Sequence, residues 1–329
     1  MVAISAFILG SCTEKLDVNP TQTISSDQAL KTEGDINATL IGAYDGIQAA
    51  TTYGGDIMVL NDLTGNSEDI QFTGTFAGLN DAYNAAMAAT NSFARDTWAA
   101  SYNAINRTNN VLANLDKITS SDNNKKKVEG EALFLRASMF FELVRLYAKA
   151  PGDGDINTNP GVPLILEPTL EITEASYVSR ATVKAVYDQV IADLNKAESL
   201  LPASNSRYAT KWAAAAQLSR VHLMLGNYAE ARDAANRVIT GSGKTLAPEF
   251  DGLWFTQINL GGTPPAEYIF WSEVTTQDGA NSINTYFGRT ISSIPGTAGR
   301  SDCKIRDSHI AKYEPGDARN YFVLSGGFF

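Results

Sequence analysis

The longest helical pattern of apolar residues in the chain runs from residue 129 to residue 150. Its apolar positions step alternately by four and three, which places them on one face of a helix. The residues of this face are Leu133, Ala137, Phe140, Val144 and Tyr147. Arg136 and Arg145 interrupt the apolar surface, so we expect their stems to pack and their guanidinium groups to meet carboxylate or carbonyl partners. The pattern predicts a broadly buried central helix that ends before Pro151.

Further stretches show the same helical spacing. Apolar residues recur with this period in residues 33–50, which Ser26 and Asp27 could cap, and in residues 96–117. Residues 122–127 are charged and polar and are predicted to form a turn. In residues 173–202 Thr182 is suited to be an N-cap, and Pro202 should stop the helix.

Residues 208–241 read as a pair of short helices joined by a Gly226-Asn227 turn. Leu223, Gly226, Tyr228 and Ala231 occupy positions typical of a tetratricopeptide repeat, whose period is about 34 residues. Small residues on both helices favour a close approach, with Ile239 predicted on the packed face. The sequence therefore predicts a mainly α protein built from tetratricopeptide-like helical repeats over residues 27–240.

Two regions lack the helical period. Residues 51–91 are punctuated by glycines and carry several aromatic residues, and a connection of about forty residues is long for a compact domain. We interpret this insertion as an ordered working surface, the alternative being a cover for the core. Residues 241–329 mix scattered aromatic residues with Gly, Ser and Thr, and include a strand-like run at 267–271. They predict an irregular, loop-rich lobe of the same domain.

Composition narrows the class of protein. Apolar residues make up 44% and charged residues 19% of the 329 positions, as in ordinary folded proteins. The formal net charge is −10, so the surface potential is negative and repels polyanions. Nucleic acid is therefore not expected as a partner.

The N-terminal residues resemble a bacterial lipoprotein signal. A short apolar run in residues 1–11 ends in Leu-Gly-Ser and is followed by Cys12, which would become the lipidated first residue. Residues 12–26 then form a polar tether. The alternative is a buried strand with an incidental cysteine. No Lys or Arg precedes Lys15, and the last residues show no stop pattern, so we expect the chain to be truncated at both ends.

These segments together resemble the SusD/RagB family of Bacteroidetes outer-membrane lipoproteins. The resemblance covers nearly the whole chain after Cys12 and rests on the order and spacing of its pieces. They are Trp98, Tyr102, Ile105 and Asn109; GEALFLRA from Gly130 with the terminal GVPL; Arg180, Thr182, Val183 and Tyr187; Ala213 to Val221 with Gly226 and Tyr228; Glu267 to Phe270; and Tyr313 with Asp317 to Arg319.

The resemblance implies a lipid-anchored protein on the cell surface of the outer membrane. It would sit over a TonB-dependent, SusC-like transporter and help to capture oligosaccharides, polysaccharides or peptides for import. The helical repeats would face the transporter and the irregular lobe would face outward. Trp98, Tyr102, Arg136 and Arg145 are then scaffold residues, and the family motifs specify no ligand contacts.

Saccharide binding needs flat aromatic faces and polar side chains that hydrogen-bond hydroxyl groups. Two regions outside the helices hold that mixture, residues 62–83 and 271–289. We therefore predict a ligand-binding set drawn from both regions. Its members are Asp69, Phe72, Phe76, Tyr83, Trp271, Tyr286 and Arg289.

Two other classes remain open. A surface glycoside hydrolase would need two carboxyl groups in a suitable setting, and Glu68 with Asp69 or Glu171 with Glu174 lack one. A repeat scaffold that holds proteins together would bind no small ligand. The alternating acids and amides of residues 153–159 resemble a calcium loop without its glycine, and a polar loop is favoured. No catalytic residue, metal or cofactor is predicted.

Overall fold

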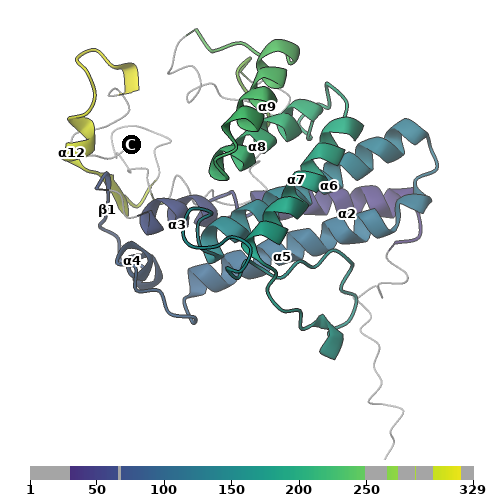
Figure 1. Ribbon diagram of the computed structural model, residues 1–329, viewed down its shortest axis with the longest axis horizontal. Helices are drawn as coiled ribbons and strands as arrows, with labels where there is room; N and C mark the ends of the chain where they lie inside the picture. The colour runs from purple at the N-terminus through teal and green to yellow at the C-terminus, as the bar shows by residue number, and fades with distance from the viewer. Residues whose placement is uncertain (1–29, 66–67, 249–264, 273–285, 287–298, 320–329) are drawn as a thin grey trace, which may run out of the picture.

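The computed structural model of the chain describes residues 30–65, 68–248, 265–272, 286 and 299–319 (Figure 1). Long helices form the body of the molecule, and a small lobe with two short strands lies at one side of it (Figure 1). The predicted mainly α fold is confirmed. No helix in the described part of the chain is long and apolar enough to span a bilayer.

The helical body is a succession in which each helix packs on the next. In order they are α2 (Glu33–Gln48), α5 (Ser92–Ala113), α6 (Asp122–Tyr147), α7 (Val183–Leu200), α8 (Lys211–Met224) and α9 (Tyr228–Gly241). Short 3-10 turns at Leu115–Lys117 and Glu174–Ser176 lie between them. Each long helix lies where the sequence period predicted one, although α6 begins seven residues before its predicted start at residue 129.

Side-chain caps fix where several helices begin. The Thr182 hydroxyl accepts a hydrogen bond from Ala185 N at 3.2 Å, which confirms the predicted start of α7. Thr32 caps α2 in a reciprocal pair with Asp35, whose carboxylate accepts from Thr32 N at 2.8 Å. Ser26 and Asp27 lie outside the described residues.

Helix α6 is the centre of the body, since α5 and α7 flank it and α2 and α8 also contact it. Nearly all its side chains from Val128 to Val144 are buried, whichever way they point. Gly130 permits the close contact with α7, because a Cβ there would stand 2.8 Å from Leu201 Cγ. The charged turn predicted at 122–127 was wrong. These residues are the first turns of α6, and their solvated side chains give no apolar period.

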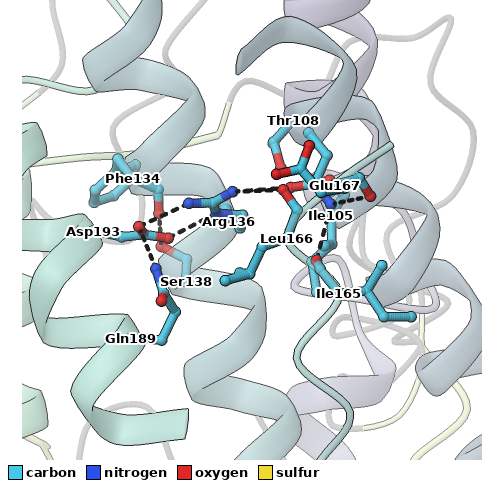
Figure 2. Close-up of polar contacts among 11 residues, drawn as sticks. Ile105, Thr108, Phe134, Arg136, Ser138, Ile165, Leu166, Glu167, Gln189 and Asp193 are labelled. Atoms are coloured by element: carbon cyan, nitrogen blue, oxygen red, sulfur yellow. Dashed lines mark hydrogen bonds and ion pairs between the residues drawn. The ribbon is translucent and has the colours of Figure 1, made fainter. Parts of the chain in front are cut away.

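A buried ion pair holds α6 to α7 (Figure 2). Nε of Arg136 donates a hydrogen bond to Asp193 Oδ2 at 2.7 Å, and Nη2 donates one to Asp193 Oδ1 at 2.9 Å. Its Nη1 reaches Asn109 Oδ1 on α5 at 3.0 Å and the Leu166 carbonyl at 3.3 Å. Gln189 donates to the same carboxylate at 2.8 Å. Three helices and the loop after α6 therefore meet at one guanidinium. The carboxylate and carbonyl partners predicted for Arg136 are confirmed.

The other predicted scaffold residues also pack on the core. Arg145 donates to Glu142 Oε2 at 2.6 Å, and Tyr53 donates to the other oxygen of that buried carboxylate at 3.2 Å. Trp98 packs its ring against Tyr102, whose hydroxyl donates to the Pro163 carbonyl at 2.8 Å. The polar loop at 153–159 is closed by its own side chains, such as Asp155 accepting from Asn157 N at 2.9 Å.

Two expectations about local structure were wrong, and one region contains elements that its sequence did not reveal. The 51–91 insertion, which lacks a helical period, contains α3 (Asp56–Thr64), β1 (Ile70–Phe72) and α4 (Ala77–Tyr83). These elements are too short to show a period between glycines. The run at 267–271 is not a strand; it is irregular and held by Phe270, whose ring packs edge-on against Phe134. Ile239 on α9 is 71% exposed rather than packed.

A second, smaller core lies beneath the lobe. The insertion elements α3, β1 and α4 build it, and β2 (Cys303–Ile305) closes it by pairing antiparallel to β1. A short helix, α12 (Asp307–Ile310), follows β2. The buried members of this core are Val59, Leu60, Leu63, Phe72, Leu79, Ala82, Tyr286 and Cys303. Asp56, at the start of α3, is buried nearby and accepts a hydrogen bond from the Tyr286 hydroxyl at 3.3 Å.

The first prediction concerns the Arg136–Asp193 pair. Asp193→Asn should lower the free energy of unfolding by about 3 to 5 kcal/mol, because it leaves a buried guanidinium without its countercharge. Urea denaturation measures this. The matched control is Asp188→Asn on the same helix, which removes an exposed pair with Lys184 and should cost less than about 1 kcal/mol. Equal losses in the two variants would contradict the prediction.

The second prediction concerns pH. Burial raises the pKa of Asp56 to about 6, aided by the charge of Asp96 and opposed by the Tyr286 hydroxyl. A carboxyl group whose pKa is higher in the folded state stabilises the fold at low pH, and this contribution is lost as pH rises through 6. The free energy of unfolding of Asp56→Asn, measured by urea titration relative to wild type, should therefore be higher at pH 7 than at pH 4 by on the order of 2 kcal/mol. Parallel pH profiles would contradict it.

Candidate functional site

The pairing of β1 with β2 brings two distant parts of the sequence together on the lobe. Ile70 lies opposite Ile305 and Phe72 opposite Cys303. The residues that follow β2 therefore lie beside Asp69, which precedes β1. Thr73 continues the contact, since its backbone N–H donates to the Asp302 carbonyl at 2.7 Å. The surface of this lobe, made by residues 68–83 and 299–319, is the candidate site.

Three of the predicted aromatic residues, Phe72, Phe76 and Tyr286, lie close together here, but their rings pack against neighbouring side chains. Phe72 and Tyr286 are only 8% and 6% exposed. Phe76 meets Phe93 and Tyr286 edge-on, with ring centroids 5.7 and 6.1 Å away, and the Arg300 guanidinium lies 4.4 Å from its centroid. Their rings are thus occupied by neighbours, because a lobe this small needs large side chains to fill its core.

Asp69 is the centre of a row of polar and aromatic groups on the lobe surface. Its Oδ1 accepts from Lys312 Nζ at 2.6 Å and lies 3.2 Å from His309 Nδ1. The other ring nitrogen of His309, Nε2, is 3.0 Å from the Tyr313 hydroxyl. The hydrogen bond from Lys312 is the main cause that lowers the pKa of Asp69. Asp69 is therefore an ionised acceptor at neutral pH.

The row continues past Tyr313. The Arg319 guanidinium lies 5.1 Å from the Tyr313 ring centroid, and its Nε donates to Asp317 Oδ1 at 2.9 Å. This pairing lowers the pKa of Asp317 to about 2. We call Asp69, His309, Lys312, Tyr313 and Arg319, together with Tyr83 at the end of α4, the lobe row. Its side chains are partly or largely exposed, so both donors and acceptors face solvent.

Tyr83 joins the lobe through a different contact. It ends α4 and is half-buried, and its hydroxyl accepts a hydrogen bond from Arg306. Arg306 follows β2 directly and also donates Nε to the Ile70 carbonyl at 3.3 Å. The predicted ligand residue Tyr83 therefore lies on the lobe with its hydroxyl oriented by a cation.

The remaining predicted residues lie elsewhere. Trp271 is half-buried between Phe270 and Ser272, whose hydroxyl donates to Gln48 at the end of α2 at 2.9 Å. Its segment is thus attached to the helical body. Arg289 and Cys12 lie outside the described residues.

Sequence reasoning missed most of the lobe row. The signal was present in residues 300–319, where basic residues, His309 and Tyr313 recur within one short stretch. Tyr313 and Arg319 contributed to the family resemblance but were not assigned a role. Their proximity to Asp69 depends on a strand pairing that local sequence does not encode.

The lobe row is suited to binding hydroxyl groups. Charged and neutral hydrogen-bonding groups alternate with the aromatic rings of Tyr83 and Tyr313, and the ionised Asp69 favours acceptance over proton donation. Among the described residues, no group of three His, Cys, Asp or Glu side chains could hold a metal ion.

Comparison with known proteins gives one family. Residues 15–223 match the sequence model of the SusD-like family, described as starch-binding and associating with the outer membrane. Two curated relatives from Formosa agariphila are SusD-like protein P2, 25% identical over 93% of this chain, and SusD-like protein P38, 29% identical over 73%. The chain spans 59% and 44% of the lengths of these relatives.

The fold agrees with solved structures. A presumed sugar-binding protein from Bacteroides vulgatus ATCC 8482 superposes with a TM-score of 0.76 at 26% identity, over 90% of this chain and 65% of that one. A SusD superfamily protein from Bacteroides thetaiotaomicron VPI-5482 gives a TM-score of 0.75 at 24% identity, with the same coverage. Because the family sequence model matches more than half of its length, this chain belongs to the SusD-like family.

Proposed function

We propose that this chain binds glycans at the cell surface and delivers them to a TonB-dependent, SusC-like transporter of the outer membrane. The starch-binding character of the family supports the ligand class, as does the similarity to the presumed sugar-binding protein of Bacteroides vulgatus. The observation that carries the proposal is the lobe row, which places ionised, neutral and aromatic groups side by side on one surface.

The lobe row fits a saccharide better than an apolar ligand. A pyranose offers hydroxyl groups at its rim and C–H groups on its faces, which match carboxylates, cations and tyrosine rings. Asp69 would accept hydrogen bonds, Lys312 and Arg319 would donate them, and Tyr83 and Tyr313 would contact the ring. Phe72, Phe76 and Tyr286 would support these groups from the core below.

The proposed role is binding without chemistry. A general acid for glycoside hydrolysis needs a raised pKa, whereas the pKa values of Asp69 and Asp317 are lowered by their cationic neighbours. The glycan should therefore be released unchanged. The helical repeats, on this proposal, contact the transporter, and lipid attachment at Cys12 holds the protein at the membrane.

The third prediction tests the lobe row. Tyr313→Ala and Tyr83→Ala should each weaken binding to a polysaccharide about tenfold, since each removes an aromatic contact. Isothermal titration with soluble starch, laminarin and other glycans in turn measures this. The matched control is Tyr177→Ala, which removes a 77% exposed tyrosine outside the lobe and should leave affinity unchanged.

Three results would count against this proposal. Unchanged affinity in both lobe variants would refute the lobe as the site. Release of shorter sugars from a bound glycan, followed by chromatography, would favour a hydrolase. Failure of the wild-type protein to bind any glycan or peptide would favour a protein scaffold.

The fourth prediction tests the anchor. Cys12→Ala should move the protein from the membrane fraction to the soluble fraction of cells and abolish incorporation of radiolabelled palmitate, because acyl chains supply the attachment. The matched control is Cys303→Ala, since Cys303 is buried in the second core and burial raises its thiol pKa to about 12. An unchanged membrane fraction for Cys12→Ala would overturn the assignment.

A further inference from the structure

An open depression lies on the helical body, away from the lobe. It forms where α7 ends, α8 begins and α9 ends, and it is open to solvent with a volume of about 530 Å³. In Figure 1 α8 and α9 lie at the upper centre, to the right of β1, α4 and α12. Its lining includes Asn195, Glu198, Ser199, Lys211, Trp212 and Arg237.

Trp212 is held in a fixed position within this depression. The six-membered edge of the indole lies against the backbone of Gly241 at the end of α9, where an added Cβ would stand 2.4 Å from Trp212 Cη2. The ammonium group of Lys211 lies 4.3 Å from the ring centroid. Only a glycine allows the indole to approach α9 this closely, so the ring is placed by the backbone.

Beside the indole, α7 and α9 are joined by a planar ion pair. Arg237 Nε donates to Glu198 Oε1 at 2.7 Å, and Nη2 donates to Oε2 at 2.8 Å. A bidentate pair of this kind holds both side chains in one orientation. The hydrogen bond to Glu198 is the main cause that raises the pKa of Arg237. The depression therefore has a rigid polar wall and a rigid aromatic ring.

Other polar groups at the depression lack partners within the described part of the chain. The Asn195 amide and the Trp212 indole N–H make no hydrogen bond to described residues, and the Lys211 ammonium has only its contact with the indole ring. A ligand could satisfy all three. An aromatic ring flanked by amide, carboxylate and cationic groups is the combination that suits a pyranose.

We propose that this depression is a second saccharide-binding site, with Trp212 as the platform for one pyranose ring. The inference rests on the proposed function, because it takes the same ligand class as the lobe. Asn195 and the Glu198–Arg237 pair provide the hydrogen bonds to hydroxyl groups. The two sites are separate, so each can be lost without the other. The depression lies on the helical repeats, so the proposal requires that their contact with the transporter leaves the α7–α9 depression open.

The test follows the indole N–H resonance of Trp212 in two-dimensional NMR spectra of the uniformly 15N-labelled protein, assigned with Trp212→Phe. Maltoheptaose and laminariheptaose are the probes, titrated separately. The resonance should shift on addition of at least one probe, and Trp212→Ala should weaken binding at this site about tenfold. Asn195→Ala, a change of an exposed residue, should weaken it several-fold.

Controls separate this site from the lobe and from misfolding. Tyr313→Ala should leave the shift of the Trp212 resonance intact. Tyr228→Ala, which removes a 71% exposed aromatic residue from α9, should do the same. Circular dichroism melting of each variant shows whether the fold is kept, and Asn195→Ala decides the outcome if Trp212→Ala does not fold.

Each result has a definite meaning. A shift that is reduced in Asn195→Ala and kept in both controls, together with weaker probe binding by Trp212→Ala in isothermal titration, supports the second site. Binding of a probe that leaves the Trp212 resonance unmoved overturns the second site while the proposed function stands. Absence of all probe binding to the wild-type protein, at the lobe as well, overturns both.

Discussion

The packing of the central helices depends on one buried guanidinium group, whose charge and N–H groups need partners. A cation inside an apolar body is costly unless its charge and its N–H groups find partners. Arg136 has a carboxylate partner and makes four hydrogen bonds, to α7, to α5 and to the loop at 165–167. Asn109 serves twice, since it accepts from Arg136 and donates to the Ile165 carbonyl at 2.9 Å. Apolar helix faces alone allow sliding, whereas these directed contacts fix the helices in one register.

The lobe is positioned by that same body. The ring of Phe93, in the first turn of α5, and the side chain of Leu146, near the end of α6, pack against the second core. Tyr53, just before α3, donates to Glu142 on α6. The insertion is therefore anchored to α5 and α6, and this anchoring fixes the position of β1 and of Asp69 beside it. A surface row of charged groups is useful for recognition only on such a rigid support.

Features that depend on residues close together in the sequence, such as helix periods and caps, could be predicted from the sequence. The period of apolar residues located α5, α6 and α7, and Thr182 marked the start of α7, because capping and burial act within a few residues. Short helices such as α3 gave no such signal. The lobe row escaped prediction for another reason, since the contact of Tyr83 with Arg306 joins residues 223 positions apart. Local propensity carries no information about such a pairing, although composition had already named Asp69 and Tyr83 as candidate ligand residues.

Two separate saccharide surfaces on one rigid body would change what the protein selects. A short oligosaccharide can occupy one surface at a time, so its affinity is that of a single weak contact. A polymer that reaches both converts the second contact into an intramolecular event, whose effective concentration depends on the length and stiffness of the intervening sugar chain. Rigidity of the body matters here, because a fixed separation favours glycans whose repeat matches it. On this proposal the helix register set by Arg136 would bear on glycan selection, since it fixes the α7–α9 depression relative to α6 and hence to the lobe.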